Sequence, residues 1–300
     1  MFSYWAYDLN ILSEIEILLL KQSDLDSFEK PHVEIKENKF LSDELDFSDN
    51  TLDFSLSKFY RKGVGYFVIK NGSIIYFQKI KGCSEEDFSR TLLHQVFARL
   101  LFQKKYICFH AGCISIQSKS FLFAGLSGSG KSTLTSEMIM KRYVQFVSED
   151  TTPIFKNQNN IRPIISFPFI KLDKKFKEIS EIAALPEIKF NRDRLNRNGF
   201  FLNEGLLAKN PLILRGCFFL EWGTKNEIKK LEKNEIFPLL LANLFKPHSS
   251  PKNMDCEEFL LGFIGEFIDS IDCYRLVRNK EKQVDFTDEI YKKIKTISGI

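Results

Sequence analysis

The chain reads Gly-Leu-Ser-Gly-Ser-Gly-Lys-Ser from Gly125 to Ser132. This stretch satisfies every position of the G-x-x-x-x-G-K-[ST] pattern, in which glycines let the backbone bend until successive N–H groups converge on an anion. The apolar run Ser120–Ala124 before it is long enough for one buried parallel strand. Leu134 and Met138 after it have helical spacing, and a helix N-terminus adds partial positive charge. The setting predicts a phosphate-binding loop of the Walker A type.

This loop is expected to bind ATP or another nucleoside triphosphate together with Mg²⁺. The Lys131 ammonium would reach the β- and γ-phosphates, and the Ser132 hydroxyl would ligate the metal. The expected nucleotide-binding residues are Gly125, Ser127, Gly128, Ser129, Gly130, Lys131, Ser132 and Thr133. A chance glycine-rich turn explains the octet less well, because strand and helix signals flank it on the correct sides.

Composition narrows the other classes of function. Hydrophobic residues make up 44% of the 300 residues, enough for a core in one large domain or two smaller ones. The formal charge of +4 comes without a dense basic block and does not favour a nucleic-acid partner. Ile11–Leu20 carries two glutamates and no basic run precedes it, so neither a signal peptide nor a membrane span is expected. We expect a cytoplasmic protein whose six cysteines are free thiols. Cys108 and Cys113 flank His110, but a role as small buried core residues explains these two cysteines better than a metal site does.

The region up to about residue 80 reads as mostly β. Asn71-Gly72 lies between two β-branched and aromatic runs, and this dipeptide accepts the positive φ values of a type I′ hairpin turn. A helical pattern follows from Ser84 to Leu101. We therefore expect a small β-rich N-terminal domain over residues 1–82 and an α/β domain over residues 83–300.

A second group of polar residues follows the strand predicted at Tyr143–Val147. Glu149 and Asp150 come at its end, about 20 residues past the loop lysine, where a phosphate-loop protein presents its metal-directed acid. One carboxylate suits Mg²⁺, and another suits the proton of an attacking hydroxyl. A bend at the strand end can aim both side chains at one site. Which of the two acts as the base stays open.

The remaining expectations concern the C-terminal half. Arg192, Arg194 and Arg197 lie in a basic loop and are candidates to clamp the transferring phosphate, with a solvated surface loop as the alternative. Strands are expected at Leu212–Leu220 and Cys273–Val277, and helices at Asn234–Leu244, at Glu257–Ile268 and near Asp288.

The chain resembles the HPr kinase/phosphorylase family, whose nearest fold relative is the ATP-dependent phosphoenolpyruvate carboxykinase. The resemblance rests on His-Ala-Gly at 110–112, the loop, and the strand ending in two acids. Tyr7–Glu14 and Tyr274-Arg275-Leu276 also look like segments of the shorter HPr kinase-like proteins of peptide-biosynthesis clusters. The resemblance implies an α/β fold in which an HPr-kinase/PEP-carboxykinase-like P-loop domain follows a small β-rich domain.

The family transfers a phosphoryl group to a serine hydroxyl of a small protein or peptide. By position, His110 matches the family's active-site histidine, and Lys131 and Ser132 match its loop lysine and magnesium ligand. Glu149 and Asp150 occupy its paired Asp-Asp positions, with Glu in the first. The resemblance thus implies a serine kinase in which His110, Lys131, Glu149 and Asp150 are catalytic, and Ser132 and Asp150 hold Mg²⁺.

Two other classes of function remain as alternatives. One is a kinase of small-molecule metabolites, and the other is a non-catalytic, nucleotide-sensing regulatory module. Retention of Lys131, Ser132 and both acids argues against a sensor. Neither the identity of the acceptor, nor the phosphoryl donor preference, nor homo-oligomer formation follows from the sequence.

Overall fold

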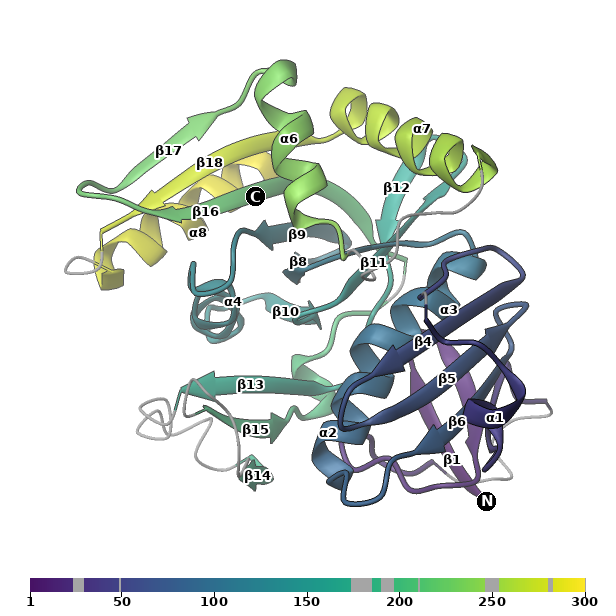
Figure 1. The fold of residues 1–300 in the computed structure, drawn as a ribbon. Helices are drawn as coiled ribbons and strands as arrows, with labels where there is room; N and C mark the ends of the chain where they lie inside the picture. Colours follow the sequence, from purple (N-terminus) through teal and green to yellow (C-terminus); the bar gives the residue numbers. More distant parts are fainter. Residues whose placement is uncertain are drawn as a thin grey trace. The chain divides into compact units, whose positions relative to one another are not determined.

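The protein is described by a computed structural model for residues 1–23, 30–48, 50–173, 185–189, 197–209, 211–245, 254–279 and 283–299. It is a mixed α/β protein, as expected (Figure 1). The chain divides into two compact units, Met1–Cys108 with Phe245–Gly262, and Phe109–Leu244 with Phe263–Ile300. Across the described ranges, no helix is both long enough and apolar enough to cross a membrane.

The first unit is built on a six-stranded sheet in the order β1-β2-β3-β6-β5-β4. The strands are β1 (Phe2–Ala6), β2 (Leu9–Ser13), β3 (Val33–Glu37), β4 (Leu56–Arg61), β5 (Gly65–Lys70) and β6 (Ile74–Lys79), with the short helix α1 (Leu41–Glu44) between β3 and β4. The predicted hairpin is confirmed, because β5 and β6 pair antiparallel and Asn71 and Gly72 have φ values of 51° and 59°.

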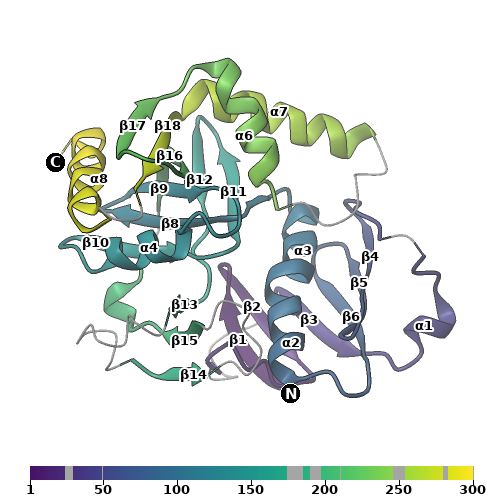
Figure 2. The ribbon, with the colours of Figure 1, turned by 60° about the vertical axis from the view of Figure 1, so that its left-hand side comes forward.

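A helical segment covers one face of this sheet (Figure 2). It begins at the predicted Ser84, whose Oγ accepts the N–H of Asp87, and consists of α2 (Glu85–Arg90), a π-helical stretch (Thr91–Val96) and α3 (Phe97–Gln103). The Tyr7 hydroxyl donates to the Leu93 carbonyl, 3.0 Å away, within the π-helical stretch, where a side-chain partner suits the widened backbone. These contacts group residues 83–108 with the first unit; the domain boundary at residue 82 stays a prediction.

The second unit is built on a mixed six-stranded sheet in the order β10-β8-β9-β16-β18-β17. Its strands are β8 (Ala111–Ile116), β9 (Lys119–Ala124), β10 (Val144–Ser148), β16 (Ile213–Trp222), β17 (Glu227–Lys230) and β18 (Asp272–Arg278). β9, β16 and β18 run parallel, while β8 is antiparallel to both of its neighbours. Three parallel strands therefore end at one edge of the sheet.

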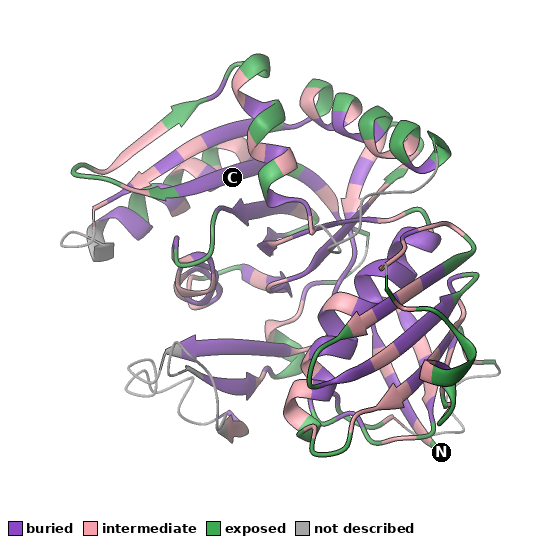
Figure 3. Cartoon of the chain, in the orientation of Figure 1, coloured by how far each residue is buried: buried purple, intermediate pink, exposed green. Residues whose placement is uncertain are grey.

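Two helices contribute to the core of this unit. α4 (Lys131–Ile139) follows the phosphate loop and contributes Leu134 and Met138, and α8 (Gln283–Ser298) contributes Phe286 and Ile290. Their apolar side chains pack with fully buried residues of the sheet, so that β8 and β9 are buried along almost their whole length (Figure 3). This packing anchors the strand and the helix on either side of the loop.

The remaining elements include both predicted and unpredicted segments. The helices are α6 (Lys233–Asn243), α7 (Met254–Ser270) and a 3₁₀ turn (Glu204–Leu206). The strands are β7 (Ile107–Phe109), β11 (Thr152–Asn157), β12 (Asn160–Pro163), β13 (Phe169–Asp173), β14 (Glu187–Lys189) and β15 (Arg197–Phe201). The strands expected at 143–147, 212–220 and 273–277 and the three C-terminal helices are confirmed to within a few residues at most ends, although α7 and α8 extend beyond the predicted segments.

Candidate functional site

Strand register brings the predicted site residues of the second unit to one edge of its sheet. Ala111, next to His110, pairs with Ala124, the last residue before the loop. Ser148, the last residue of β10, pairs with Cys113 near the start of β8. The start of β8 and the ends of β9 and β10 therefore coincide, at the carboxyl edge of the parallel strands where ligands bind in open α/β sheets.

The backbone of the predicted phosphate loop has a bent conformation that its glycines allow. Gly125, Gly128 and Gly130 have φ values of 149°, 83° and 84°, which side-chain-bearing residues rarely adopt. Ser129 N–H donates to the Leu126 carbonyl at 3.1 Å and closes a turn inside the loop. Gly130 then serves as the N-cap of α4 in the left-handed region. The loop can thus leave the strand and enter the helix within a few residues.

Several N–H groups of the loop point to no protein acceptor. Among the described residues, no hydrogen-bond partner exists for the backbone N–H groups of Gly128, Gly130, Ser132 and Thr133. Such groups at the start of a helix are the donors with which phosphate-binding loops hold an anion. The loop therefore offers donors of the kind that a polyphosphate requires.

Lys131 lies in the loop with its ammonium already directed inward. The side chain is buried, and Nζ donates to the carbonyls of Gly125 at 2.7 Å and Leu126 at 3.2 Å. Ser132 is half-buried in the first turn of α4. An ammonium and a hydroxyl on successive residues give the loop a cation for phosphate oxygens and an oxygen ligand for Mg²⁺.

Asp150 is held between a histidine and a lysine. Its Oδ1 lies 3.1 Å from His110 Nδ1, and its Oδ2 lies 2.9 Å from Lys171 Nζ. His110 Nδ1 is also 3.0 Å from the Asp150 carbonyl oxygen. Because both oxygens accept, the hydrogen lies on Nδ1, and Nε2 faces no partner among the described residues. The carboxylate is therefore oriented by two side chains.

Glu149 belongs to the same cluster. It is buried, and its Oε2 accepts the backbone N–H of Lys171 at 3.1 Å. Lys171 thus binds Glu149 through its main chain and Asp150 through its side chain, so that β13 holds both acids after β10 ends. This explains how adjacent residues are fixed at a single strand end.

The backbone at Asp150 is strained. Its φ is 68°, and Thr151 N–H donates to the Glu149 carbonyl at 2.8 Å, which closes a γ-turn centred on Asp150. A residue other than glycine in this region carries a conformational cost that the surrounding contacts must offset. Strain of this kind concentrates at ligand and catalytic sites, and here it turns the Asp150 carboxylate toward His110.

Asn243, at the end of α6, connects the loop to the histidine. Its Oδ1 accepts the Gly125 N–H at 2.6 Å, and its carbonyl accepts the His110 N–H at 2.8 Å. Its Nδ2 donates to the Leu239 carbonyl at 2.8 Å, so the orientation of the amide is fixed by both of its ends. This residue was not predicted from the sequence, because the two site residues that it contacts, Gly125 and His110, lie more than 100 positions away.

Trp222 and Arg278 form the other unpredicted contact with the loop. Trp222 Nε1 donates to the Gly128 carbonyl at 2.8 Å, and Arg278 Nη2 donates to the Ser129 carbonyl at 2.5 Å. They end the parallel strands β16 and β18. Their positions at the carboxyl ends of two expected strands were the signal that would have indicated them.

The other sequence predictions lie partly outside the described residues. Arg192 and Arg194 are not among them, and Arg197 is described only through its backbone, which begins β15 opposite Asp173. The cysteines are free, and burial raises the pKa of Cys108 and of Cys113 well above the usual range. Such thiols behave as small core residues, as expected.

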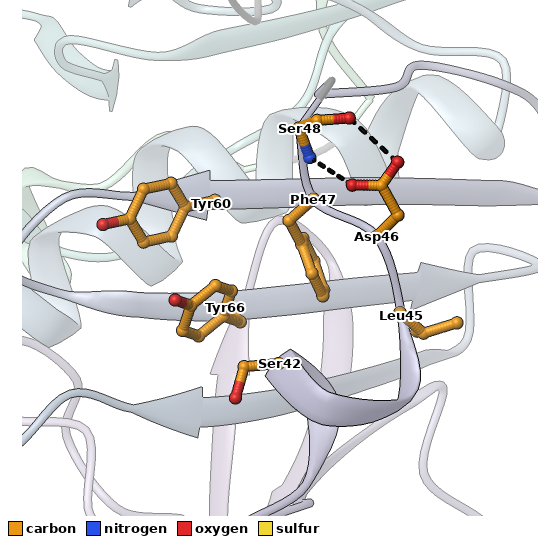
Figure 4. Close-up of a pocket in the computed structure, with 7 residues that line it drawn as sticks. All are labelled: Ser42, Leu45, Asp46, Phe47, Ser48, Tyr60 and Tyr66. Carbon is orange, nitrogen blue, oxygen red and sulfur yellow. Dashed lines mark hydrogen bonds between the residues drawn. The ribbon is translucent and has the colours of Figure 1, made fainter.

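A pocket in the first unit has a different character (Figure 4). Its volume is about 410 Å³, and it is lined by Ser42, Leu45, Asp46, Phe47, Ser48, Tyr60 and Tyr66. Tyr60 and Tyr66 stack with their ring centroids 4.7 Å apart, and both oxygens of its one carboxylate, Asp46, accept hydrogen bonds from Ser48. It lacks the paired acid and base of the site in the second unit.

Comparisons with known proteins give a likeness to solved structures and none to a family model. No protein-family model matches the chain, and no curated protein matches it. A solved structure that it resembles is the HPr(Ser) kinase/phosphatase from Coxiella burnetii, at 10% sequence identity and a TM-score of 0.32, over 64% of this chain and 98% of that chain. A likeness this low establishes neither fold nor activity, so the functional interpretation rests on the residues of the site.

Proposed function

We propose that the protein is an ATP- and Mg²⁺-dependent kinase that phosphorylates a serine or threonine hydroxyl of a peptide or small protein. One observation carries the proposal: the phosphate loop, with its unpartnered N–H groups, shares a sheet edge with the Asp150 carboxylate that His110 and Lys171 orient. The choice of a peptide or protein acceptor follows from the family resemblance of the sequence.

The loop residues would hold the donor nucleotide. The N–H groups of Gly128, Gly130 and Ser132 would bind phosphate oxygens, and Lys131 would exchange its two carbonyl partners for the β- and γ-phosphates. Charged donors of this kind stabilise the transferring phosphoryl group more than the ground state when they are positioned in advance.

The donor set also suits Mg²⁺. No group of three or more His, Cys, Asp or Glu side chains within the described ranges is arranged to hold a metal ion. The Ser132 hydroxyl and the Asp150 carboxylate would supply two oxygen ligands, and phosphate oxygens and water would complete the shell, as is usual for Mg²⁺. When bound, the ion would neutralise charge on the phosphates.

The acids would receive the proton. Asp150 or Glu149 takes the hydroxyl proton as the acceptor oxygen bonds to the γ-phosphorus and the bond from that phosphorus to the bridging oxygen breaks, releasing the nucleoside diphosphate. His110 keeps the Asp150 carboxylate in place through Nδ1–H. A positioned base contributes roughly 10²–10⁴ in rate.

The direct test is phosphoryl transfer to a panel of synthetic serine- and threonine-containing peptides with Mg·ATP, read by mass spectrometry. We expect phosphate on a hydroxyl oxygen, stable to acid. Lys131→Ala should lower the rate by about 10²–10³-fold, the usual effect of losing one preorganised donor. Lys141→Ala is the matched control, since this half-exposed lysine lies beyond the other end of α4 and its ion pair is with Asp288.

The outcome also separates the alternatives. Phosphate on small hydroxyl metabolites and on no peptide would indicate a metabolite kinase. Free phosphate alone, or nucleotide binding without turnover, would indicate a hydrolase or a regulatory sensor. Transfer at the wild-type rate by Lys131→Ala would refute the site itself.

A further inference from the structure

We propose that Trp222 and Arg278 are positioning residues that brace the phosphate loop from outside, so that the empty loop already has its nucleotide-binding shape. The proposal rests on the nucleotide site proposed above. It concerns two residues that lie outside the G-x-x-x-x-G-K-[ST] pattern.

The two side chains form a unit. Trp222 and Arg278 are register partners on the neighbouring parallel strands β16 and β18, and the guanidinium carbon lies 4.5 Å from the centroid of the Trp222 ring. Arg278 is 3% exposed, and stacking on the indole holds its planar fork in one orientation. The pair therefore presents two hydrogen-bond donors to the loop from a rigid base.

These donors decide which way the loop peptides face. In a planar trans peptide the C=O and the following N–H point in opposite directions. Arg278 binds the Ser129 carbonyl, so the Gly130 N–H is turned to the opposite side. Trp222 binds the Gly128 carbonyl, which supports the turn that the next N–H, of Ser129, closes with Leu126. The brace thus leaves a free donor facing away from itself.

The loop and the brace are fitted closely. A Cβ placed on Gly130 would lie 2.1 Å from Arg278 Nη2 and 3.1 Å from Trp222 Cζ2, whereas a Cβ on Gly128 would meet nothing within 4 Å. A Cβ on Gly130 would therefore require the Arg278 guanidinium to shift away from the loop, and the φ of 84° favours glycine independently. The loop and the Trp222–Arg278 pair therefore have complementary shapes.

The charge of Arg278 also suits an anionic ligand. No acid lies within ion-pair distance of it among the described residues, although Glu137 is near enough to interact weakly. Burial lowers its pKa to about 10, so it remains charged at neutral pH. A buried cation behind the loop stabilises phosphate in the loop without an ion pair of its own.

The first experiment measures the mobility of the loop in the absence of nucleotide. Hydrogen–deuterium exchange over residues 125–133 should be faster in Arg278→Met and in Trp222→Phe than in the wild type. The phenylalanine variant keeps an aromatic ring but loses the N–H donor. Arg275→Met is the matched control on the same strand, because Arg275 is half-exposed and lies near Glu221 and Glu235 instead. Unchanged exchange in both brace variants would overturn the proposal, whether or not the protein binds nucleotide.

The second experiment measures nucleotide binding by tryptophan fluorescence. The chain has two tryptophans, so a Trp5→Phe background leaves Trp222 as the only indole. Mg²⁺ with a non-hydrolysable ATP analogue should change its emission in a saturable way, and should not do so in Lys131→Ala. Arg278→Met should raise the dissociation constant of the nucleotide analogue at least 10-fold. Arg278→Lys should raise it by less, and Arg275→Met should leave it unchanged. Equal affinity in Arg278→Met and wild type would contradict the brace, whereas no binding by wild type would contradict the nucleotide site.

Discussion

Arg99 in the first unit and Arg278 in the second are each buried over an aromatic ring, and the two arginines differ in what surrounds them. Arg99 in the first unit is fully buried, with its guanidinium carbon 3.9 Å from the Phe59 centroid and Nη1 donating to the Gln95 carbonyl at 2.9 Å. Arg278 in the second unit stacks on Trp222 and donates to the phosphate loop. One arginine thus packs in a helix–sheet core, and the other lies beside a glycine-rich loop.

The difference shows how to separate structural from functional buried charge. Around Arg99 the backbone is helical, because α3 directly follows the π-helical stretch that contains the acceptor Gln95, and Nε and Nη2 find no hydrogen-bond partner in the described part of the chain. Around Arg278 the loop has positive φ at Gly128 and Gly130, and the N–H groups of the loop named above remain available for a ligand. We infer that disturbing the loop edge changes chemistry more than stability, and that any effect of disturbing Arg99 falls on stability alone.

The largest expected effect tests the chemical side of this contrast. Asp150→Asn keeps the shape of the side chain but removes the charge that pairs with Lys171, so phosphoryl transfer should fall by roughly 10²–10⁴-fold. Glu149→Gln and His110→Ala should also lose rate more than nucleotide affinity. Steady-state kinetics and calorimetric nucleotide binding would measure the two quantities.

Thermal unfolding supplies the control for these variants. Each should unfold as a single transition near the wild-type temperature. If all three variants lost only nucleotide affinity and kept the wild-type rate at saturation, the catalytic assignment would be wrong. If they unfolded instead, the contrast between the two regions would disappear.

A smaller effect sharpens the contrast within the loop. Gly130→Ala and Gly128→Ala both place alanine at a φ near 84°, which costs about 1–2 kcal/mol, but only Gly130→Ala also collides with Arg278. We expect Gly130→Ala to lower the free energy of unfolding by a further ~1–3 kcal/mol, the usual cost of overpacking. Chemical denaturation of the nucleotide-free protein measures this difference.

The clash can be tested by removing its second partner. In an Arg278→Met background the gap between the two alanine variants should shrink, since a flexible side chain can move away from the new methyl group. A gap of unchanged size would mean that Arg278 does not define the space at Gly130.

Local pattern predicted the parts of the site that depend on neighbours in sequence. The loop, the strand before it and the acids at the end of the next strand follow from composition within a few residues, and the structure has the expected elements there. The carboxylates are predicted by position alone. The γ-turn at Asp150 is not, because nothing in Ser-Glu-Asp-Thr signals a positive φ.

The side chains that orient the site could not be predicted in the same way. Lys171 reaches Asp150 across 21 positions, Asn243 reaches Gly125 across 118, and Arg278 reaches Ser129 across 149. Such pairs depend on strand order and register, which the hydrophobic pattern of each segment does not encode. The end positions of parallel strands were the one available signal, and they indicate Trp222 and Arg278 without identifying their partners.

The smallest expected effect tests the structural side of the comparison, at Arg99. Burial lowers the pKa of this guanidinium to about 9, which reflects the cost of removing its charge from water. Methionine fills a similar volume without that cost, so Arg99→Met should leave the free energy of unfolding unchanged or raise it by about 1–2 kcal/mol. Arg99→Lys should lower it, because an ammonium keeps the charge but cannot stack as a planar fork on Phe59. Neither change should alter phosphoryl transfer, the opposite of the pattern expected for Arg278→Met. A loss of more than 2 kcal/mol in Arg99→Met would show that the hydrogen bond to Gln95 and the ring contact outweigh the desolvation.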